Sequence, residues 1–375
     1  MTSWVTVVAE GQRTLTEVDG EVTAARVTLQ TVADRVGVSR MTVSNAFSRP
    51  DQLSPALRAR ILAVADELGY VGPDPTARAL ARGSTGAVGV LLTDSLETAF
   101  TDPIATRFLG AVAAGLHPTG LALTLLTTAM GEVVPAKDIA LDGAIVYSCI
   151  PRSSSIDWLQ RRRLPLVFVD QAPPDGYPSV TIDDRAGAAA AARHLVELGH
   201  RRVALLAASA IHPPGQLPDV AELLDSHVTK ERLRGWLDEL EPAGIQPSIM
   251  IQPPYQAGPE WARRLLDADE PPTAVLCFSD IIALDVLAVA RAVGLRIPED
   301  LSVVGYDDAP FASHVTPALT TVAQDVDAKG RTAAALLVDE IAARRGASRD
   351  DAAPARDVTL PTRLVVRAST APPRT

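Results

Sequence analysis

The sequence predicts a small all-α head followed by a larger α/β domain of two lobes. Three observations carry this prediction. Residues 27–49 contain two short helical stretches joined by a tight turn, the pattern of a helix-turn-helix. From about Ala87, apolar runs alternate with amphipathic stretches, which indicates parallel strands joined by helices. The head is basic, whereas the rest of the chain is acidic.

The head begins with two capped helices. Thr28 and Ser39 can each cap a helix, and Gly37 lies where the chain must leave the first helix sharply. Ala33 is small, as required where two helices cross closely. The facing sides carry apolar residues, namely Val32, Val36, Val38, Val43 and Ala46.

The second helix of this pair predicts contact with DNA. Its outward side chains can reach base edges in a major groove; they are Arg40, Met41, Thr42, Ser44 and Asn45. An ordinary helical hairpin within a larger bundle is the alternative. Six constrained positions in register over this short segment favour the DNA-reading motif.

A third helix and a short fourth one complete the head. Ser54-Pro55 is a cap followed by proline at the first helical position, and an amphipathic run then continues to Gly69. A Gly- and Pro-rich break over 72–75 precedes a helix-capable stretch, 76–82. A helix of that length is marginal alone in water, so it is expected to order against DNA or a second copy.

Charge separates the head from the rest. Residues 26–83 hold eight arginines and five acids, a net charge of +3, whereas the remainder has a net charge of −13. A basic head on an acidic body suits a protein that meets phosphate at one end only. Arginine dominates the basic residues, with lysine only at Lys137, Lys230 and Lys329.

Composition indicates a protein of the cytoplasm. The 375 residues are 47% apolar, enough for one small and one large domain. Cys149 and Cys277 lack a partner nearby in sequence, which suggests a reducing compartment. No apolar run reaches transmembrane length, and residues 1–25 lack the pattern of a signal peptide. These 25 residues are expected to form a loose arm, and a mis-assigned start codon would account for them.

The larger domain contains more strand–helix units than one sheet holds comfortably, so two lobes are expected. Strands are predicted over 87–93, 121–127, 143–148, 165–170, 203–208, 249–252, 274–279 and 301–307. Helices are predicted over 185–198, 230–240, 259–266 and 281–293.

Acidic residues follow several of these strands. Asp170 and Asp307 end predicted strands, and Asp280 follows another. Asp183 ends the short run Val180-Thr-Ile-Asp, which also has the character of a strand. In such folds ligands bind beyond the carboxyl ends of the strands. The alternative is that these carboxylates cap the following helices. We expect caps at Asp183 and Asp280 and ligand contacts at the other two.

Motifs along most of the chain carry a family resemblance. They are Val27-Thr-Leu, Val32-Ala, Gly37-Val-Ser, Thr42-Val-Ser, Glu67-Leu-Gly-Tyr70, Ala77-Arg-Ala-Leu80 and Gly89-Val-Leu91. Together they resemble the lac repressor family of transcription regulators, from about Val27 to about Thr370. The resemblance implies two Rossmann-like lobes, similar to periplasmic sugar-binding proteins, with three chain crossings between them.

The resemblance also implies how DNA is bound. In this family two hinge helices pair across a dimer and insert a leucine into the minor groove, and Leu80 matches that leucine. Packing of Leu80 against the core is the alternative. One extra residue around 73–75 departs from the family hinge. The full set expected to contact DNA is Thr28, Ser39, Arg40, Met41, Thr42, Ser44, Asn45, Arg49, Tyr70, Ala77, Arg78 and Leu80.

For the lobes, the resemblance implies a ligand site. Arg232 matches the family's arginine, Gln324 falls where a ligand-facing polar residue is common, and Ser279 replaces a frequent asparagine. The expected effector contacts are Asp170, Arg232, Ser279, Asp307 and Gln324. Pairing of Arg232 with one of the carboxylates is the alternative. A short link over 126–142 and a long segment over 209–229 indicate a reshaped cleft.

Catalytic and metal-binding motifs are missing from the sequence. It contains no G-x-S-x-G elbow, H-E-x-x-H motif or Walker sequence, and its six histidines are scattered. We expect no enzyme activity, no cofactor and no metal site. An α/β enzyme fused to a DNA-binding head would need a nucleophile or cofactor loop.

The sequence thus predicts a ligand-responsive transcription regulator, most simply a repressor, which binds a palindromic operator as a homodimer and a small effector resembling a sugar or nucleoside. A solute-receptor-type binding protein with a non-functional head is the alternative. The expected organisation is an arm (1–25), a helix-turn-helix domain (26–72), a hinge helix and linker (73–86), a two-lobed effector domain (87–370) and a tail (371–375).

Overall fold

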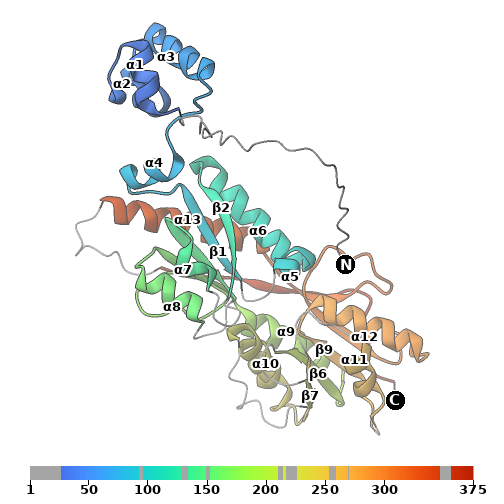
Figure 1. The fold of residues 1–375 in the computed structure, drawn as a ribbon. Helices are drawn as coiled ribbons and strands as arrows, with labels where there is room; N and C mark the ends of the chain where they lie inside the picture. Colours follow the sequence, from blue (N-terminus) through green and yellow to red (C-terminus); the bar gives the residue numbers. More distant parts are fainter. Residues whose placement is uncertain are drawn as a thin grey trace, which may run out of the picture. The chain divides into compact units, whose positions relative to one another are not determined.

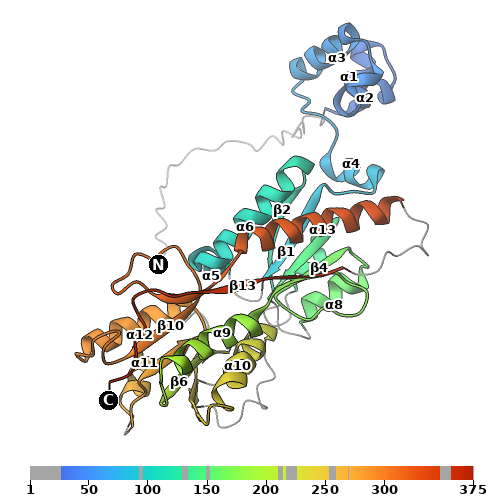
Figure 2. The same ribbon diagram turned by 180° about the vertical axis from the view of Figure 1, so that it is seen from behind.

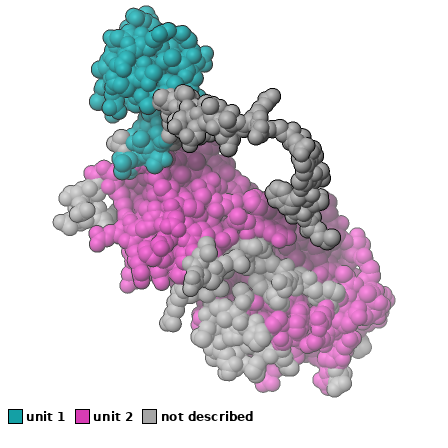
Figure 3. Space-filling model, viewed as in Figure 1, with its two compact units in different colours: residues 1–83 teal, residues 84–375 magenta. Residues whose placement is uncertain are grey.

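The computed structural model describes residues 27–92, 96–128, 134–148, 153–209, 214–216, 226–252, 259–268, 270–346 and 356–374. The expected arm over 1–25 therefore lies outside the described residues. The chain forms two compact units, residues 1–83 and 84–375 (Figure 3). The division falls within the segment expected to be hinge and linker.

The first unit is helical, with α1 (Leu29–Val36), α2 (Arg40–Ser48), the short η1 (Pro50–Gln52), α3 (Pro55–Glu67) and α4 (Pro75–Arg82). Its helix caps are the ones that the sequence predicted. Thr28, Ser39 and Ser54 accept hydrogen bonds at the starts of α1, α2 and α3, and Gly37 is left-handed at φ 77°. Val32, Val36, Val43 and Ile61 lie in the shared core. The expected helix over 76–82 is present as α4.

The second unit contains two sheets, one in each lobe (Figure 1). Lobe 1 has a six-stranded parallel sheet in the order β12-β5-β4-β3-β1-β2. Its strands are β1 (Ala87–Leu92), β2 (Ala122–Thr127), β3 (Gly143–Tyr147), β4 (Leu166–Val169), β5 (Ser179–Ile182) and β12 (Asp357–Leu360). Its helices are α5 (Leu96–Thr101), α6 (Pro103–Leu116), η2 (His117–Thr119), α7 (Pro135–Asp138), α8 (Ser154–Arg161) and α13 (Val326–Gly346).

Strand alternation in lobe 1 buries both faces of the sheet. Val90 and Val167 face the cluster that contains α6 and α13, whereas Leu91 and Phe168 face α7 and α8. The helices α6 and α13 lie side by side, as both ribbon views show (Figures 1 and 2). The helix α7 has four residues, in agreement with the short link expected between the second and third strands.

Lobe 2 has a seven-stranded sheet in the order β13-β11-β10-β9-β6-β8-β7, parallel except for its two edge strands. Its strands are β6 (Val203–Ala208), β7 (Gly215–Gln216), β8 (Ser248–Gln252), β9 (Ala274–Cys277), β10 (Ser302–Asp307), β11 (Thr320–Gln324) and β13 (Thr362–Val365). The helices α9 (Asp184–Glu197) and α10 (His227–Leu240) belong to one core cluster, and α11 (Pro259–Leu266) and α12 (Asp280–Ala292) to the other.

The chain passes between the lobes three times. It leaves lobe 1 after β5, returns after β11 to form α13 and β12, and crosses again to β13. The three crossings implied by the family resemblance are therefore present. Beyond residue 370, Ala371 accepts hydrogen bonds from Ser302 Oγ and pairs with His200 Nε2, so this end of the described chain lies on lobe 2.

The start of the second unit is held by one carboxylate. Asp142, just before β3, accepts hydrogen bonds from the backbone N–H groups of Thr85 and Gly86 at 2.6 and 3.0 Å, and from Ser84 Oγ at 2.7 Å. Arg345, near the end of α13, donates to Asp142 and to Ser84. The residues that follow the head are thus fixed to lobe 1.

A pair of helical glycines tests the packing. A Cβ on Gly235 in α10 would lie 2.2 Å from the Arg185 carbonyl oxygen of α9, whereas one on Gly110 in α6 meets nothing within 4 Å. We expect Gly235→Ala to lower the free energy of unfolding by about 1–3 kcal/mol through overpacking. Gly110→Ala should be neutral or stabilising by up to about 1 kcal/mol. Thermal denaturation of the full chain measures both, and equal effects of the two variants would refute the close helix contact.

Candidate functional site

Four described polar residues at strand ends of the second unit have a positive φ angle: Asp308, with φ 52°, and three that belong to the site. Ser148 follows β3 with φ 48°, Asp170 follows β4 with φ 56°, and Asp307 ends β10 with φ 110°. Non-glycine residues adopt this conformation at a cost of about 1–3 kcal/mol, and such residues cluster at functional sites. All three line one cavity between the lobes, of about 80 Å³.

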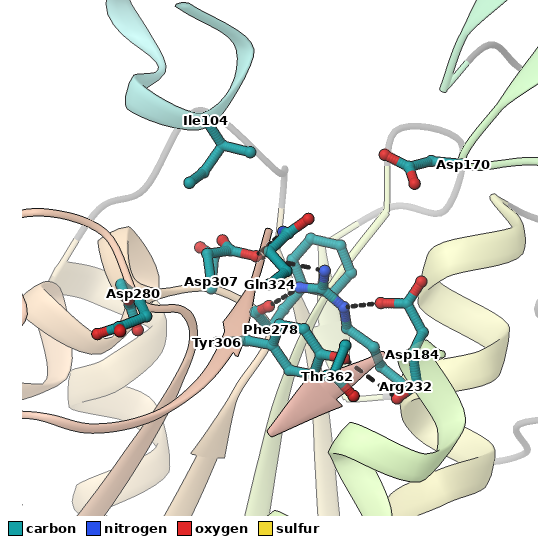
Figure 4. Close-up of polar contacts among 12 residues, drawn as sticks. Ile104, Asp170, Asp184, Arg232, Phe278, Asp280, Tyr306, Asp307, Gln324 and Thr362 are labelled. Atoms are coloured by element: carbon teal, nitrogen blue, oxygen red, sulfur yellow. Dashed lines mark hydrogen bonds and ion pairs between the residues drawn. The ribbon is translucent and has the colours of Figure 1, made fainter. Parts of the chain in front are cut away.

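Arg232 is the centre of the cavity wall on lobe 2. Its guanidinium is buried and donates to Asp184 Oδ1 at 2.7 Å, to Asp307 Oδ1 at 3.4 Å and to the Phe278 carbonyl oxygen (Figure 4). The ring of Tyr306 lies under it, 3.6 Å from the guanidinium carbon. Although burial opposes the charge, the two carboxylates raise the pKa of Arg232. It therefore stays protonated.

A run of side-chain hydrogen bonds leads from Asp307 to lobe 1. Gln324, at the end of β11, donates from Nε2 to Asp307 Oδ1 at 2.7 Å and accepts at Oε1 from Lys329 Nζ at 2.9 Å. Lys329, on α13, also donates to Asp170 Oδ2 at 2.6 Å. Figure 4 shows Asp170 and Ile104 facing the Arg232 group across the site. This run of hydrogen bonds thus connects Asp307 of lobe 2 with Asp170 of lobe 1 through the Gln324 amide and the Lys329 ammonium group.

Burial changes the acidity of this site. It raises the pKa of Asp307 to about 6, against the opposing effect of Arg232, and it also raises the pKa of Asp184 and of Asp102. One oxygen of Asp170 and one of Asp184 are buried without a hydrogen-bond partner. Asp170 lines the cavity, so its unpaired oxygen can accept a hydrogen bond from a ligand hydroxyl group.

The structure brings together all five residues expected to contact an effector. Asp170, Arg232, Ser279, Asp307 and Gln324 line the same cavity. Ser279 also accepts from the Ile282 N–H as the cap of α12. Arg232 is paired with carboxylates, as the alternative interpretation expected, yet it still lines the cavity. Binding of an effector by these residues stays a prediction.

One of the two expected caps is wrong. Asp183 caps α9, as predicted, but Asp280 is the first residue of α12 and Ser279 caps that helix. The Asp280 carboxylate accepts from the Ala309 N–H at 2.7 Å and pairs with Thr321 Oγ1 at 2.5 Å. The helix begins one residue earlier than the sequence pattern suggested, which turns this side chain inward.

Sequence reasoning missed Lys329, Asp184 and Asp102, which surround the expected residues. Asp102 caps α6 and lines the cavity with Ile104. The rarity of lysine in this chain was the one signal that could have drawn attention to Lys329. A larger hollow, about 560 Å³, is lined by Arg107, Asp327 and Arg363 among others, but Arg107 and Asp327 already pair with each other at 2.6 Å.

The outward face of α2 carries the residues expected to contact DNA. Arg40 and Met41 are exposed, Met41 to 69%, and Ser39 and Thr42 bond to each other at 2.8 Å. Asn45 Nδ2 donates to Gln52 at 3.1 Å. Arg49 is exposed, Ser44 is half-buried, and Thr28 is bonded to Thr31 in its cap.

Two exposed arginines of the first unit donate hydrogen bonds to backbone carbonyl groups of α1 and α2. Arg58 Nε donates to the Ala46 carbonyl oxygen, and Arg60 Nη2 donates to that of Val36.

The Tyr70 ring lies edge-on to Phe47 at 5.7 Å. On α4, Ala77 and Arg78 are exposed, and Leu80 is 86% exposed. Packing of Leu80 against a core, the alternative considered from the sequence, is therefore not seen in the first unit.

Comparisons with known proteins agree with this architecture. The profile described as "Bacterial regulatory proteins, lacI family" matches residues 28–72, and that of a "Periplasmic binding protein-like domain" matches residues 192–370. The HTH-type transcriptional regulator IpsA of Corynebacterium glutamicum is 37% identical over 328 residues, which cover 84% of this chain and 91% of IpsA. The chain belongs to the lacI family of bacterial regulatory proteins.

Further lacI-family proteins match along nearly the whole chain. The HTH-type transcriptional regulator CelR of Thermobifida fusca is 32% identical, over 92% of this chain and 98% of CelR. A CelR–cellobiose complex superposes with a TM-score of 0.66 at 30% identity, covering 92% of this chain and 100% of that one. The lac repressor dimer bound to operator and the anti-inducer ONPF gives 0.72 at 27% identity, with coverage of 92% and 99%.

This lacI-family chain is a DNA-binding transcriptional regulator with a periplasmic-binding-protein-like effector domain, as the sequence predicted. It is a regulator and not an enzyme, because its relatives are transcriptional regulators. No helix in the described part of the chain combines the length and the apolar character needed to cross a bilayer.

Asp280 gives a prediction for the site. Burial and the nearby Asp307 raise its pKa to about 8, so the folded protein holds a proton that the unfolded chain lacks between about pH 4 and 8. Its contribution to stability therefore falls as pH rises through this window. We expect the melting temperature of Asp280→Asn to decline less from pH 5.5 to 8 than that of wild type. Asp280→Leu should lose about 1–3 kcal/mol at pH 5.5, because the Ala309 N–H is left unpaired, and this deficit should shrink as the pH rises. Parallel pH profiles of wild type and Asp280→Asn would refute the protonated carboxyl.

Proposed function

We propose that the protein represses transcription in the cytoplasm by binding a palindromic operator as a homodimer, under control of a neutral polyhydroxylated effector held between the lobes. The observation that carries the proposal is the cavity at the strand ends, where Asp170, Arg232, Asp307 and Gln324 converge. A cavity lined by donors and acceptors at fixed positions suits a sugar-like ligand.

The DNA-binding part of the proposal concerns α2 and α4. Arg40 and Met41 extend from α2 into the major groove, and their neighbours Thr42, Ser44 and Asn45 complete the base-reading face, with Ser39 and Thr28 at the backbone. Arg49, Tyr70 and Arg78 contact phosphates. On α4, Ala77 allows close approach to the minor groove and the exposed Leu80 inserts between base pairs. Two copies are required for two half-sites, which makes the operator palindromic.

The chemistry of the cavity favours a neutral effector. Its lining includes three carboxylates, those of Asp102, Asp170 and Asp307, and two cations, those of Arg232 and Lys329. A phosphate or carboxylate on the ligand would add repulsion, whereas hydroxyl groups can donate to the carboxylates and accept from the cations. CelR was solved with cellobiose, which supports a sugar.

Ligand binding and DNA binding are coupled through the relative position of the lobes. The cavity of about 80 Å³ is smaller than most ligand sites, so an effector must change the spacing of its walls. An effector that favours the form able to pair two hinge helices acts as a corepressor, and one that favours the other form acts as an inducer.

The DNA contacts can be tested with duplexes selected from a random pool by the full chain. We expect a palindrome with a flexible pyrimidine–purine step at its centre. Arg40→Ala should then weaken binding about 10- to 100-fold, the effect of losing one base-reading contact of about 1–3 kcal/mol. Leu80→Ala should weaken binding and reduce the DNA bend. Arg263→Ala, which removes an exposed arginine of the second unit, is the control and should change nothing. Wild-type affinity in both head variants would exclude this binding mode.

The effector site can be tested through pH. Calorimetry with D-glucose, D-ribose and cellobiose should identify a sugar that binds at pH 7.5. Because the charged carboxylate of Asp307 is a much stronger acceptor for a ligand hydroxyl than its protonated form, and its pKa is about 6, affinity should be weaker at pH 5, by up to roughly tenfold. Asp307→Asn should bind more weakly than wild type and lose this pH dependence. An unchanged slope in that variant would remove Asp307 from the site.

A further inference from the structure

Lys329 occupies an unusual position for a lysine of this chain. Only three of the 35 basic residues are lysines, and Lys329 is buried, at 1% exposure, on the cavity side of α13. Its helix is fixed, since a Cβ on the adjacent Gly330 would lie 2.6 Å from Ala111 Cβ of α6. The ammonium group therefore has a defined position at the cavity wall.

The ammonium group of Lys329 makes two hydrogen bonds, fewer than its number of N–H donors. Nζ has three N–H donors, and it bonds to Asp170 Oδ2 at 2.6 Å and to Gln324 Oε1 at 2.9 Å. The other oxygen of Asp170, Oδ1, is buried and has no hydrogen-bond partner. Lys329 Nζ also lies 6.0 Å from the centre of the Tyr147 ring, and its third N–H makes no hydrogen bond to a described residue. This donor and the unpaired Asp170 Oδ1 thus lie on adjacent groups of lobe 1, both lining the cavity.

A purely structural role explains this arrangement poorly. Buried ion pairs contribute little net stability compared with apolar residues of similar size, and an unpaired buried oxygen adds a further cost. Asp170 also has a left-handed backbone, which is unfavourable for a non-glycine residue. A ligand oxygen that accepts from Nζ, and a ligand hydroxyl that donates to Oδ1, would satisfy both groups.

We propose that Lys329 is a specificity-determining residue of the effector site. Its ammonium and Asp170 Oδ1 together hold two neighbouring hydroxyl groups of a neutral sugar, on the wall opposite Arg232. This inference rests on the proposed function, because it assumes a polyhydroxylated effector in this cavity. Lys329 selects the position and orientation of one hydroxyl pair, whereas Arg232 and Asp307 hold the other side of the ring.

The rarity of lysine makes a direct spectroscopic test possible. Protein labelled with ¹³C at the lysine ε carbon gives three side-chain signals, which Lys137→Met, Lys230→Met and Lys329→Met assign. On titration of the full chain with D-glucose, D-ribose and cellobiose, the Lys329 signal should shift as the bound sugar saturates. The signals of Lys137 and Lys230 should stay in place.

Affinity provides the second readout. Lys329→Met should weaken sugar binding at least tenfold, the effect expected for losing a hydrogen bond to a charged group. If Lys329→Met fails to fold because Asp170 is left unpaired, Lys329→Arg keeps a cation there and should change the order of preference among the three sugars. Lys137→Met and Lys230→Met, which make the same replacement elsewhere, should bind within twofold of wild type.

Deoxy sugars separate a ligand contact from a structural role. For wild type, removal of one hydroxyl of the paired diol should weaken binding, and the same removal should have little further effect in Lys329→Met. If a sugar binds wild type and both Lys329 variants equally, this inference fails and the proposed function stands. If none of the three sugars shifts a lysine signal or binds by calorimetry, the sugar effector and the role of Lys329 both fail.

Discussion

The buried positive charge of Arg232 organises the lobe 2 side of the cleft. The Arg232 guanidinium is removed from water, and an unpaired charge in that position would cost several kcal/mol. Its neighbours therefore come from three places in lobe 2: Asp184 begins α9, Tyr306 and Asp307 end β10, and Phe278 follows β9. These contacts hold the start of α9 and the end of β10 around one side chain.

The same constraint extends to lobe 1 through two residues. Gln324 contacts Asp307 on one side and Lys329 on the other, and Lys329 reaches Asp170. A change in the spacing of the lobes must therefore alter a continuous run of hydrogen bonds. An effector that breaks some of these hydrogen bonds can form new ones to the same side chains through its own hydroxyl groups. The same atoms therefore bind the ligand and hold the lobes in position.

The sequence predicted those features that depend on local chemistry. The caps at Thr28, Ser39 and Ser54 and the left-handed Gly37 involve neighbours within four residues, so a short segment contains all the information they need. The cavity residues at strand ends were also predictable, because the carboxyl ends of parallel strands meet at one edge.

The features that escaped prediction depend on distant neighbours. Lys329 stands in a polar stretch that reads as a solvated helix face, and it becomes buried only because α13 returns to lobe 1 beside Asp170. The sequence pattern predicts a helix from Ile281 with Asp280 as its cap, but the helix begins at Asp280. The partners of this carboxylate, Ala309 and Thr321, lie 29 and 41 residues away in the chain. Neither the return of the chain nor these pairings can be read from periodicity.

The three crossings between the lobes have a consequence for the order of synthesis. The sheet of lobe 1 is completed by β12, and the helix that covers its face beside α6 is α13, yet both follow the whole parallel core of lobe 2 in the chain. A nascent chain therefore exposes its helix-turn-helix at the ribosome long before either lobe is closed. Truncation after β11 would remove α13 and β12 and leave lobe 1 incomplete, but it would keep the helix-turn-helix. A prematurely terminated chain would therefore lose the effector domain while it still carries the DNA-reading helix.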